Sequence, residues 1–207
     1  MDSLTCFPKA QLTNNGVVSA RLLELKINDF QAAAQFLLDI PYGLNDTKDD
    51  PLIAIKDNRG TCTTKHMCFA TLAEELSIDV VKTLGIYEMT ETIVQGTNNL
   101  LKKYQLPYIP HTHCFLEYKN YRVDLTEGNN NGKQTSIEDY IYTQQTKPDI
   151  SPKEEYLIYK KILQEDILQR PEMSNIGEKT ILKAREDGIK LIKANVLKPN
   201  NAESQVK

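Results

Sequence analysis

Two short β-type runs that lie two residues apart constrain the fold of this chain more than any other feature. Residues 113–118 and 121–126 are separated only by Lys119 and Asn120, which is the length of a tight hairpin turn. Side chains alternate between the two faces of such a pair. One face is almost fully apolar and consists of Cys114, Leu116, Tyr118, Tyr121, Val123 and Leu125. We therefore predict an antiparallel sheet whose apolar face packs on the core.

The opposite face of the predicted hairpin carries polar side chains that are suited to chemistry. A turn at residues 119–120 places Phe115 opposite Asp124. His113 then lies diagonal to Asp124, with Cβ atoms about 7 Å apart or less. An imidazole N–H reaches a carboxylate over that gap, so the sequence predicts a His113–Asp124 pair on a face turned away from the core. His111 lies on the same face and is the rival base.

A glycine turn places Cys62 at the start of a predicted helix. Gly60 and Thr61 precede the cysteine, and the helix is expected to reach about residue 76, with a buried stripe of Phe69, Leu72, Ala73 and Leu76. A thiol at a helix start meets free backbone N–H groups and the positive end of the helix dipole, which favour the thiolate. We predict that Cys62 is a nucleophile, that His113 is its base and that Asp124 fixes the imidazole tautomer.

Two further residues near Cys62 are candidates for supporting roles. Asn58 is close enough in sequence to serve as a second donor to an oxyanion, beside the Cys62 backbone N–H. His66 lies one helical turn after Cys62 and is either a hydrogen-bonded structural histidine or a group that tunes the thiolate. Cys68 and Cys114 have apolar neighbours, and we interpret them as inert core thiols.

These residues resemble the transglutaminase-like superfamily, whose core is related to papain-type cysteine proteases. The family pattern is a cysteine that opens a helix after a glycine and a spacer, then a strand histidine, then an aspartate followed by threonine. Residues 52–126 cover it, and the matching positions are Gly60-Thr61-Cys62, His113 and Asp124-Leu125-Thr126. The resemblance implies a cysteine hydrolase or acyltransferase that needs no cofactor and acts on a peptide, a protein or a small amide. The chain has no tryptophan, so the resemblance leaves the second oxyanion donor unassigned.

We predict an α+β fold with a papain/transglutaminase-like core, in which the Cys62 helix packs on an antiparallel sheet and C-terminal helices follow. Helices are expected within residues 17–40, where Asn28 or Asp29 is a suitable cap, and a strand over residues 79–89. Residues 91–103 are ambiguous. The predicted organisation is a catalytic core, a C-terminal helical extension of the same domain and a disordered tail, at 1–150, 151–197 and 198–207.

Two irregular segments and one helix start complete the sequence prediction. Residues 1–16 are interpreted as a loose lead-in, and the asparagine-rich stretch 127–135 as a mobile linker. The C-terminal extension opens at a capping box formed by Ser151 and Glu154, with proline at the first helical position.

The charge and composition of the chain limit its function class. A net charge of -3 and a sequence pI of about 5.7 argue against a nucleic-acid partner. No apolar run approaches the roughly 18 residues of a membrane span, and no signal peptide is apparent, so a cytoplasmic location is expected. Four cysteines without paired spacing indicate reduced thiols.

Two other classes of protein remain open at this point. One is a catalytically silent binding module that keeps the same fold. The other is a metal-binding protein, because the candidate residues are all zinc-ligand types: Cys62, His111, His113 and Asp124.

Overall fold

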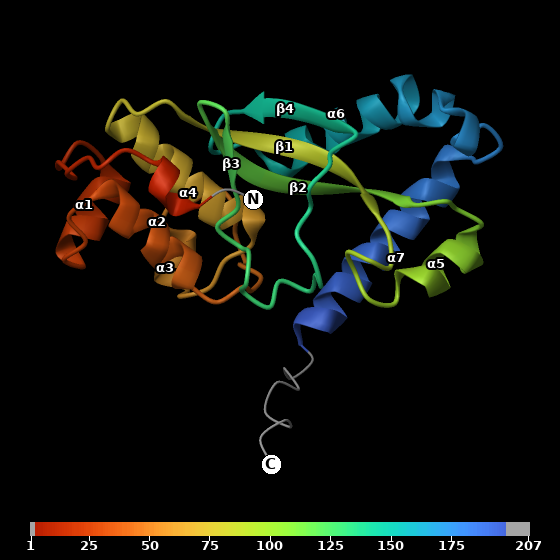
Figure 1. Cartoon of the computed structure of the whole chain (residues 1–207), viewed down its shortest axis with the longest axis horizontal. Coiled ribbons are helices and arrows are strands. Elements are labelled where there is room, and N and C mark those ends of the chain that lie inside the picture. Colours follow the sequence, from red (N-terminus) through yellow and green to blue (C-terminus); the bar gives the residue numbers. More distant parts are fainter. Residues whose placement is uncertain (1–2, 198–207) are drawn as a thin grey trace, which may run out of the picture.

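The computed structural model describes residues 3–197 and has a mixed α+β architecture. Within that range seven α-helices surround one four-stranded antiparallel sheet, as Figure 1 shows. The helices of the N-terminal part lie at the left of the sheet in this view, and those of the C-terminal part lie mainly at its right. The α+β class predicted from the sequence is therefore confirmed. The tail predicted to be disordered, 198–207, lies outside the described residues.

The sheet has the strand order β3-β2-β1-β4. Its strands are β1 (Val80–Met89), β2 (Ile109–Tyr118), β3 (Tyr121–Val123) and β4 (Tyr142–Thr146). The hairpin has the predicted register, because Tyr118 pairs with Tyr121. The ladder between β2 and β3 ends where Leu116 pairs with Val123, so Asp124 follows the strand instead of lying within it. Before Leu116, β2 therefore has no strand on that side.

Four helices precede the sheet: α1 (Val17–Glu24), α2 (Phe30–Asp39), α3 (Ile53–Lys56) and α4 (Cys62–Glu75). Asp29 caps α2, since its Oδ1 accepts the Ala32 N–H at 2.8 Å, as the sequence predicted. Helix α4 begins at Cys62, also as predicted. The polar first turn of α4 therefore lies at one end of the helix, and its apolar stripe packs in the cluster that the helix shares with the sheet.

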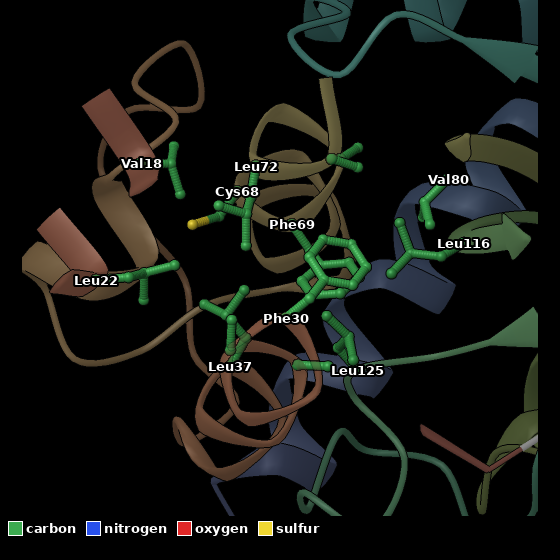
Figure 2. Close-up of a cluster of buried hydrophobic side chains, with 14 of the residues drawn as sticks. Val18, Leu22, Phe30, Leu37, Cys68, Phe69, Leu72, Val80, Leu116 and Leu125 are labelled. Carbon is green, nitrogen blue, oxygen red and sulfur yellow. The ribbon is translucent and has the colours of Figure 1, made fainter. Parts of the chain in front are cut away.

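Helices α2 and α4 share an apolar cluster with the sheet, which Figure 2 shows. The rings of Phe30 and Phe69 lie with centroids 4.5 Å apart, and Leu116 of β2 faces them across the cluster. Leu125 belongs to the same cluster, so the residue after Asp124 is fixed by burial. The prediction of a loose lead-in was wrong for Phe7, which is 2% exposed and packs 4.9 Å from the Phe69 ring.

The C-terminal part adds α5 (Thr97–Tyr104), α6 (Pro152–Glu165) and α7 (Glu178–Val196). Helix α5 begins after Gly96, whose φ of +93° favours glycine, and this resolves the ambiguous stretch. The predicted capping box opens α6, because Ser151 and Glu154 exchange hydrogen bonds. Tyr159 of α6 and Ile181 of α7 pack in a second apolar cluster with the ends of β1 and β2. No helix among residues 3–197 is long and apolar enough to cross a membrane.

The sheet face that carries His113 is buried, although the sequence predicted that it would look away from the core. Phe115, on that face, is fully buried, and its ring centroid lies 4.7 Å from that of Tyr140. Gly85 makes room for this ring, because a Cβ there would lie 2.2 Å from Tyr140 Cδ1. The segment that follows β3 thus packs back over the sheet. Part of the predicted linker, including Asn131, is buried in the same way.

Candidate active site

Cys62 is held by close packing of the turn that precedes α4. A Cβ on Gly60 would lie 2.9 Å from Lys65 Cγ and 3.0 Å from Ala54 Cβ, so the turn approaches its neighbours as closely as only glycine allows. Ala54 belongs to α3, so this short helix packs directly against the turn. Cys62 itself is partly exposed. The turn thus presents the thiol at the N-terminal end of a buried helix.

Lys65 fastens this helix to the segment that contains Asp124. Its side chain is fully buried, and Nζ donates to the carbonyl oxygens of Leu38 (3.1 Å), Ile40 and Leu125 (3.2 Å). Burial lowers the pKa of Lys65 to about 8. The three carbonyls come from the end of α2, the following turn and the residue after Asp124. One buried cation therefore fixes three backbone segments around the site.

Asp124 is the centre of a buried hydrogen-bond network. Its Oδ2 lies 2.6 Å from His113 Nε2, and its Oδ1 accepts from the Thr126 backbone N–H (2.8 Å) and hydroxyl (2.6 Å). Lys133 Nζ lies 3.4 Å from Oδ2. Burial opposes ionisation, but attraction by His113 outweighs it and holds the pKa of Asp124 well below its usual range. The predicted His113–Asp124 pair is therefore present as an ionised carboxylate against an imidazole.

His66 has the structural role that was one of its two predicted options. Its Nε2 accepts the Leu125 backbone N–H at 2.8 Å, so this nitrogen carries no proton. The ring is fully buried, and burial lowers the pKa of His66. A neutral His66 therefore positions Leu125, and with it the neighbouring Asp124.

The side chains of His113 and Cys114 act on Cys62 as partners that lower the pKa of its thiol. Because Asp124 occupies His113 Nε2, Nδ1 is the ring nitrogen that remains for Cys62. The Cys114 bond, and then the charge of His113, lower the pKa of Cys62 well below its ordinary value against the effect of burial. Burial and the Lys133 charge lower the pKa of His113, but Asp124 and Cys62 outweigh them and raise it to about 9. Both shifts favour a thiolate and an imidazolium at neutral pH.

Cys114 is buried, in agreement with its interpretation as a core thiol, but it also adjoins the site. Because β3 pairs only with residues 116–118, the edge of β2 is open at Cys114, and the Cys114 backbone also helps to lower the pKa of Cys62. The Cys114 Sγ lies 3.7 Å from Glu155 Oε1 on α6. The bond to Cys62, together with burial and Glu155, raises the pKa of Cys114 well above its ordinary value. Cys114 thus stays protonated, and its S–H donates to Glu155 Oε1.

Two candidates from the sequence are not brought into this network. His111 Nδ1 bonds the neighbouring Thr112 carbonyl at 3.0 Å, and burial followed by the Arg185 charge lowers the pKa of His111 to about 4. The structure therefore does not support His111 as the base that pairs with Asp124 in place of His113. Asn58 is exposed in the turn before α4, with φ +48°, and its side chain hydrogen-bonds to none of the residues described at 3–197.

Three tyrosines that the sequence prediction missed lie around Cys62. Tyr42 forms a parallel bridge with Gly60 at the turn, and Tyr87 lies on β1 with its ring centroid 5.7 Å from that of His111. Burial first, and then the negative charge of Cys62, raises the pKa of Tyr87. Burial, then Asp124 and then Cys62 raise the pKa of Tyr140. All three hydroxyls therefore remain protonated and are able to donate. Nothing in their local sequence marks them, because they come from three separate segments.

Lys133 was also missed, because it lies in the segment interpreted as a linker. Its side chain is 6% exposed, and its Nζ contacts Asp124 and, at 3.7 Å, Glu127. In the sequence Lys133 is a single lysine after Asn131 and Gly132, and such a residue is ordinary on a protein surface. Its position is determined by tertiary packing alone.

The described residues offer no group of three or more His, Cys, Asp or Glu side chains that could hold a metal ion. Comparisons of the chain with protein-family models, with curated proteins and with solved structures found no match. The chemistry of the site must therefore be argued from its geometry. That geometry is a low-pKa thiol at a helix start, an imidazole with a buried carboxylate behind it, and a neutral thiol at its side.

Proposed function

We propose that this protein is a cysteine-dependent acyl-transfer enzyme, either an amide or peptide hydrolase or a transamidase. The proposal includes a papain/transglutaminase-like core with Cys62 as nucleophile, His113 as base and Asp124 as the orienting acid. The observation that carries it is the 2.6 Å contact between His113 Nε2 and Asp124 Oδ2, together with the effect of His113 on Cys62, whose pKa it lowers. The same set of a nucleophile, a base and an orienting acid forms nucleophilic sites on several unrelated folds.

The proposed reaction begins from the thiolate–imidazolium pair. The Cys62 sulfur attacks the carbonyl carbon of an amide, a C–S bond forms, and the electron pair of the C=O bond moves to oxygen. When this tetrahedral species collapses, the C–N bond breaks and the His113 Nδ1 proton goes to the leaving amine. The product of this half-reaction is a thioester on Cys62 with neutral His113.

The second half-reaction restores the resting pair. Water or an amine attacks the thioester carbonyl and gives its proton to His113, after which the C–S bond breaks and Cys62 leaves as the thiolate. Water gives hydrolysis and an amine gives transamidation. Asp124 stays ionised throughout and stabilises the imidazolium, in keeping with its depressed pKa.

Acylation by p-nitrophenyl acetate tests this proposal without knowledge of the natural substrate. We expect a burst of p-nitrophenolate from the wild type and a single acetyl group on the peptide that contains Cys62. Cys62→Ala abolishes both. Cys6→Ala is the matched control, because Cys6 is also a partly exposed thiol but belongs to the N-terminal segment, and it leaves both unchanged.

The test also separates the proposed enzyme from a silent binding module. A binding module with this fold gives no burst, and its Cys62 alkylates with iodoacetamide no faster than a free thiol below pH 7. Either result in the folded wild type contradicts the proposal.

A further inference from the structure

Tyr140 lies against the same sheet face as His113 although it belongs to neither strand of the hairpin. Its ring stacks on Phe115 at 4.7 Å, with an interplanar angle of 31°. It also covers Gly85, which pairs directly with His113 in the β1–β2 ladder. The next residue is anchored, because the Ile141 N–H donates to Ile86 O at 2.8 Å. The ring is therefore held in place beside His113 from both sides.

The hydroxyl of Tyr140 is buried and has no hydrogen-bond partner among residues 3–197. An unsatisfied buried hydroxyl has lost its water partners without a replacement, so this group destabilises the fold as it stands. A phenylalanine would fill the same space without that cost. The surroundings explain why a polar atom is useful there, since the charges of Asp124 and Cys62 both act on this hydroxyl. It is thus a donor without an acceptor on the sheet face that carries His113.

We propose that the Tyr140 hydroxyl is a catalytic hydrogen-bond donor that binds the substrate carbonyl oxygen as it becomes an oxyanion on attack by Cys62. The inference rests on the function proposed above. Tyr140 then acts beside the Cys62 backbone N–H, which belongs to the first residue of α4 and has no partner within the helix. A tyrosine hydroxyl is among the side-chain donors that serve oxyanion holes. The acceptor that Tyr140 lacks is supplied by the substrate.

This assignment replaces Asn58 as the second donor. Asn58 is exposed, and its side chain makes no hydrogen bond to the described residues, so nothing holds it toward Cys62. Thr61 Oγ1 is also buried without a partner, but its hydroxyl lies on the N-cap residue, where unbonded helix N–H groups are its natural donors. Tyr140 lacks a partner for its hydroxyl and is also held by its ring contacts beside His113.

Tyr140→Phe tests the assignment by comparing two reactions of the same thiolate. Acylation by p-nitrophenyl acetate passes through an oxyanion, whereas alkylation by iodoacetamide displaces iodide at a CH2 carbon and forms none. We expect acylation of the variant to fall by about 10²-fold, which is typical of the loss of one oxyanion donor. The alkylation rate and its pH profile stay unchanged. Thermal unfolding reports that the variant folds, with a midpoint equal to or above that of the wild type.

The control variant is Tyr159→Phe, which removes another buried tyrosine hydroxyl. That hydroxyl donates to Pro110 O at 3.1 Å within the second apolar cluster, so its loss lowers the unfolding midpoint and leaves acylation unchanged.

The outcomes distinguish the inference from the function on which it rests. If the wild type shows a burst and Tyr140→Phe shows the same burst, the inference is wrong and the proposed function stands. If acylation and alkylation fall together, Tyr140 acts on the thiolate and not on the oxyanion, which also overturns the inference. If the wild type is not acylated at all, both proposals fail.

Discussion

Asp124→Asn removes one negative charge from the site while preserving its shape. The asparagine carbonyl retains the bonds that Oδ1 accepts from Thr126. The amide NH2 then takes the place of Oδ2 and faces His113 Nε2, where two donors would meet. The imidazole avoids this conflict only by moving its proton to Nδ1, where it is neutral and no longer able to take a proton from Cys62.

The size of the effect follows from the charge pair that is lost. Two unit charges about 4 Å apart attract by about 4 kcal/mol at the effective dielectric constant near 20 that suits protein sites. That is worth about 10³ in the thiolate–imidazolium population, because 1.36 kcal/mol corresponds to a factor of ten. Lys133 remains beside the site and opposes the imidazolium further. The His113 pKa therefore falls from about 9 toward its ordinary value.

The assay is the rate of Cys62 alkylation by iodoacetamide as a function of pH. We expect the variant to react about 10²- to 10³-fold more slowly than the wild type at pH 6.5, with the difference shrinking as the pH rises and the thiol ionises unaided. Asp187→Asn, which removes a surface carboxylate paired with Lys103, is the control and leaves the profile unchanged. An Asp124→Asn profile that overlays the wild-type profile would refute the charge argument.

Three further substitutions test separate parts of the structure. Cys114→Ala removes the largest contribution to the low pKa of Cys62, so the pH midpoint of alkylation moves upward; an unmoved midpoint contradicts this role. Gly85→Ala places a methyl group 2.2 Å from the Tyr140 ring and should lower the free energy of unfolding in urea by about 1–3 kcal/mol; unaltered stability would mean that the ring is not packed there. Ser151→Ala removes the cap of α6 and should cost about 0.5–2 kcal/mol in the same measurement, with no change in alkylation; a change there would show that α6 positions the site.

Local sequence rules predicted the elements that carry the site. The helix at Cys62 and the cap at Asp29 were found because a helix start has its own chemistry, which neighbouring residues display. The His113–Asp124 pair was found because a two-residue turn determines the register, and alternation then determines which side chains meet. Both predictions depend on residues close together in the chain.

The groups that complete the site depend on contacts between distant segments, and the sequence did not predict them. Cys114 was assigned to the core by alternation, but β3 is too short to cover the edge where it meets Cys62. Lys133 and Tyr140 lie in a segment without periodicity, so no pattern indicated that it packs over His113. That packing also explains why the polar sheet face is buried instead of open.

The most direct test of the central claim is the thiolate absorbance near 240 nm, measured as the difference between wild type and Cys62→Ala across a pH titration. A group with a depressed pKa stays ionised as the pH falls, until the pH passes below that lowered pKa. We therefore expect the Cys62 thiolate signal to be fully present at pH 7 and to disappear only in acid. A signal that appears only as the pH rises through about 8.5, the ordinary value for a cysteine, would contradict an ion pair between Cys62 and His113.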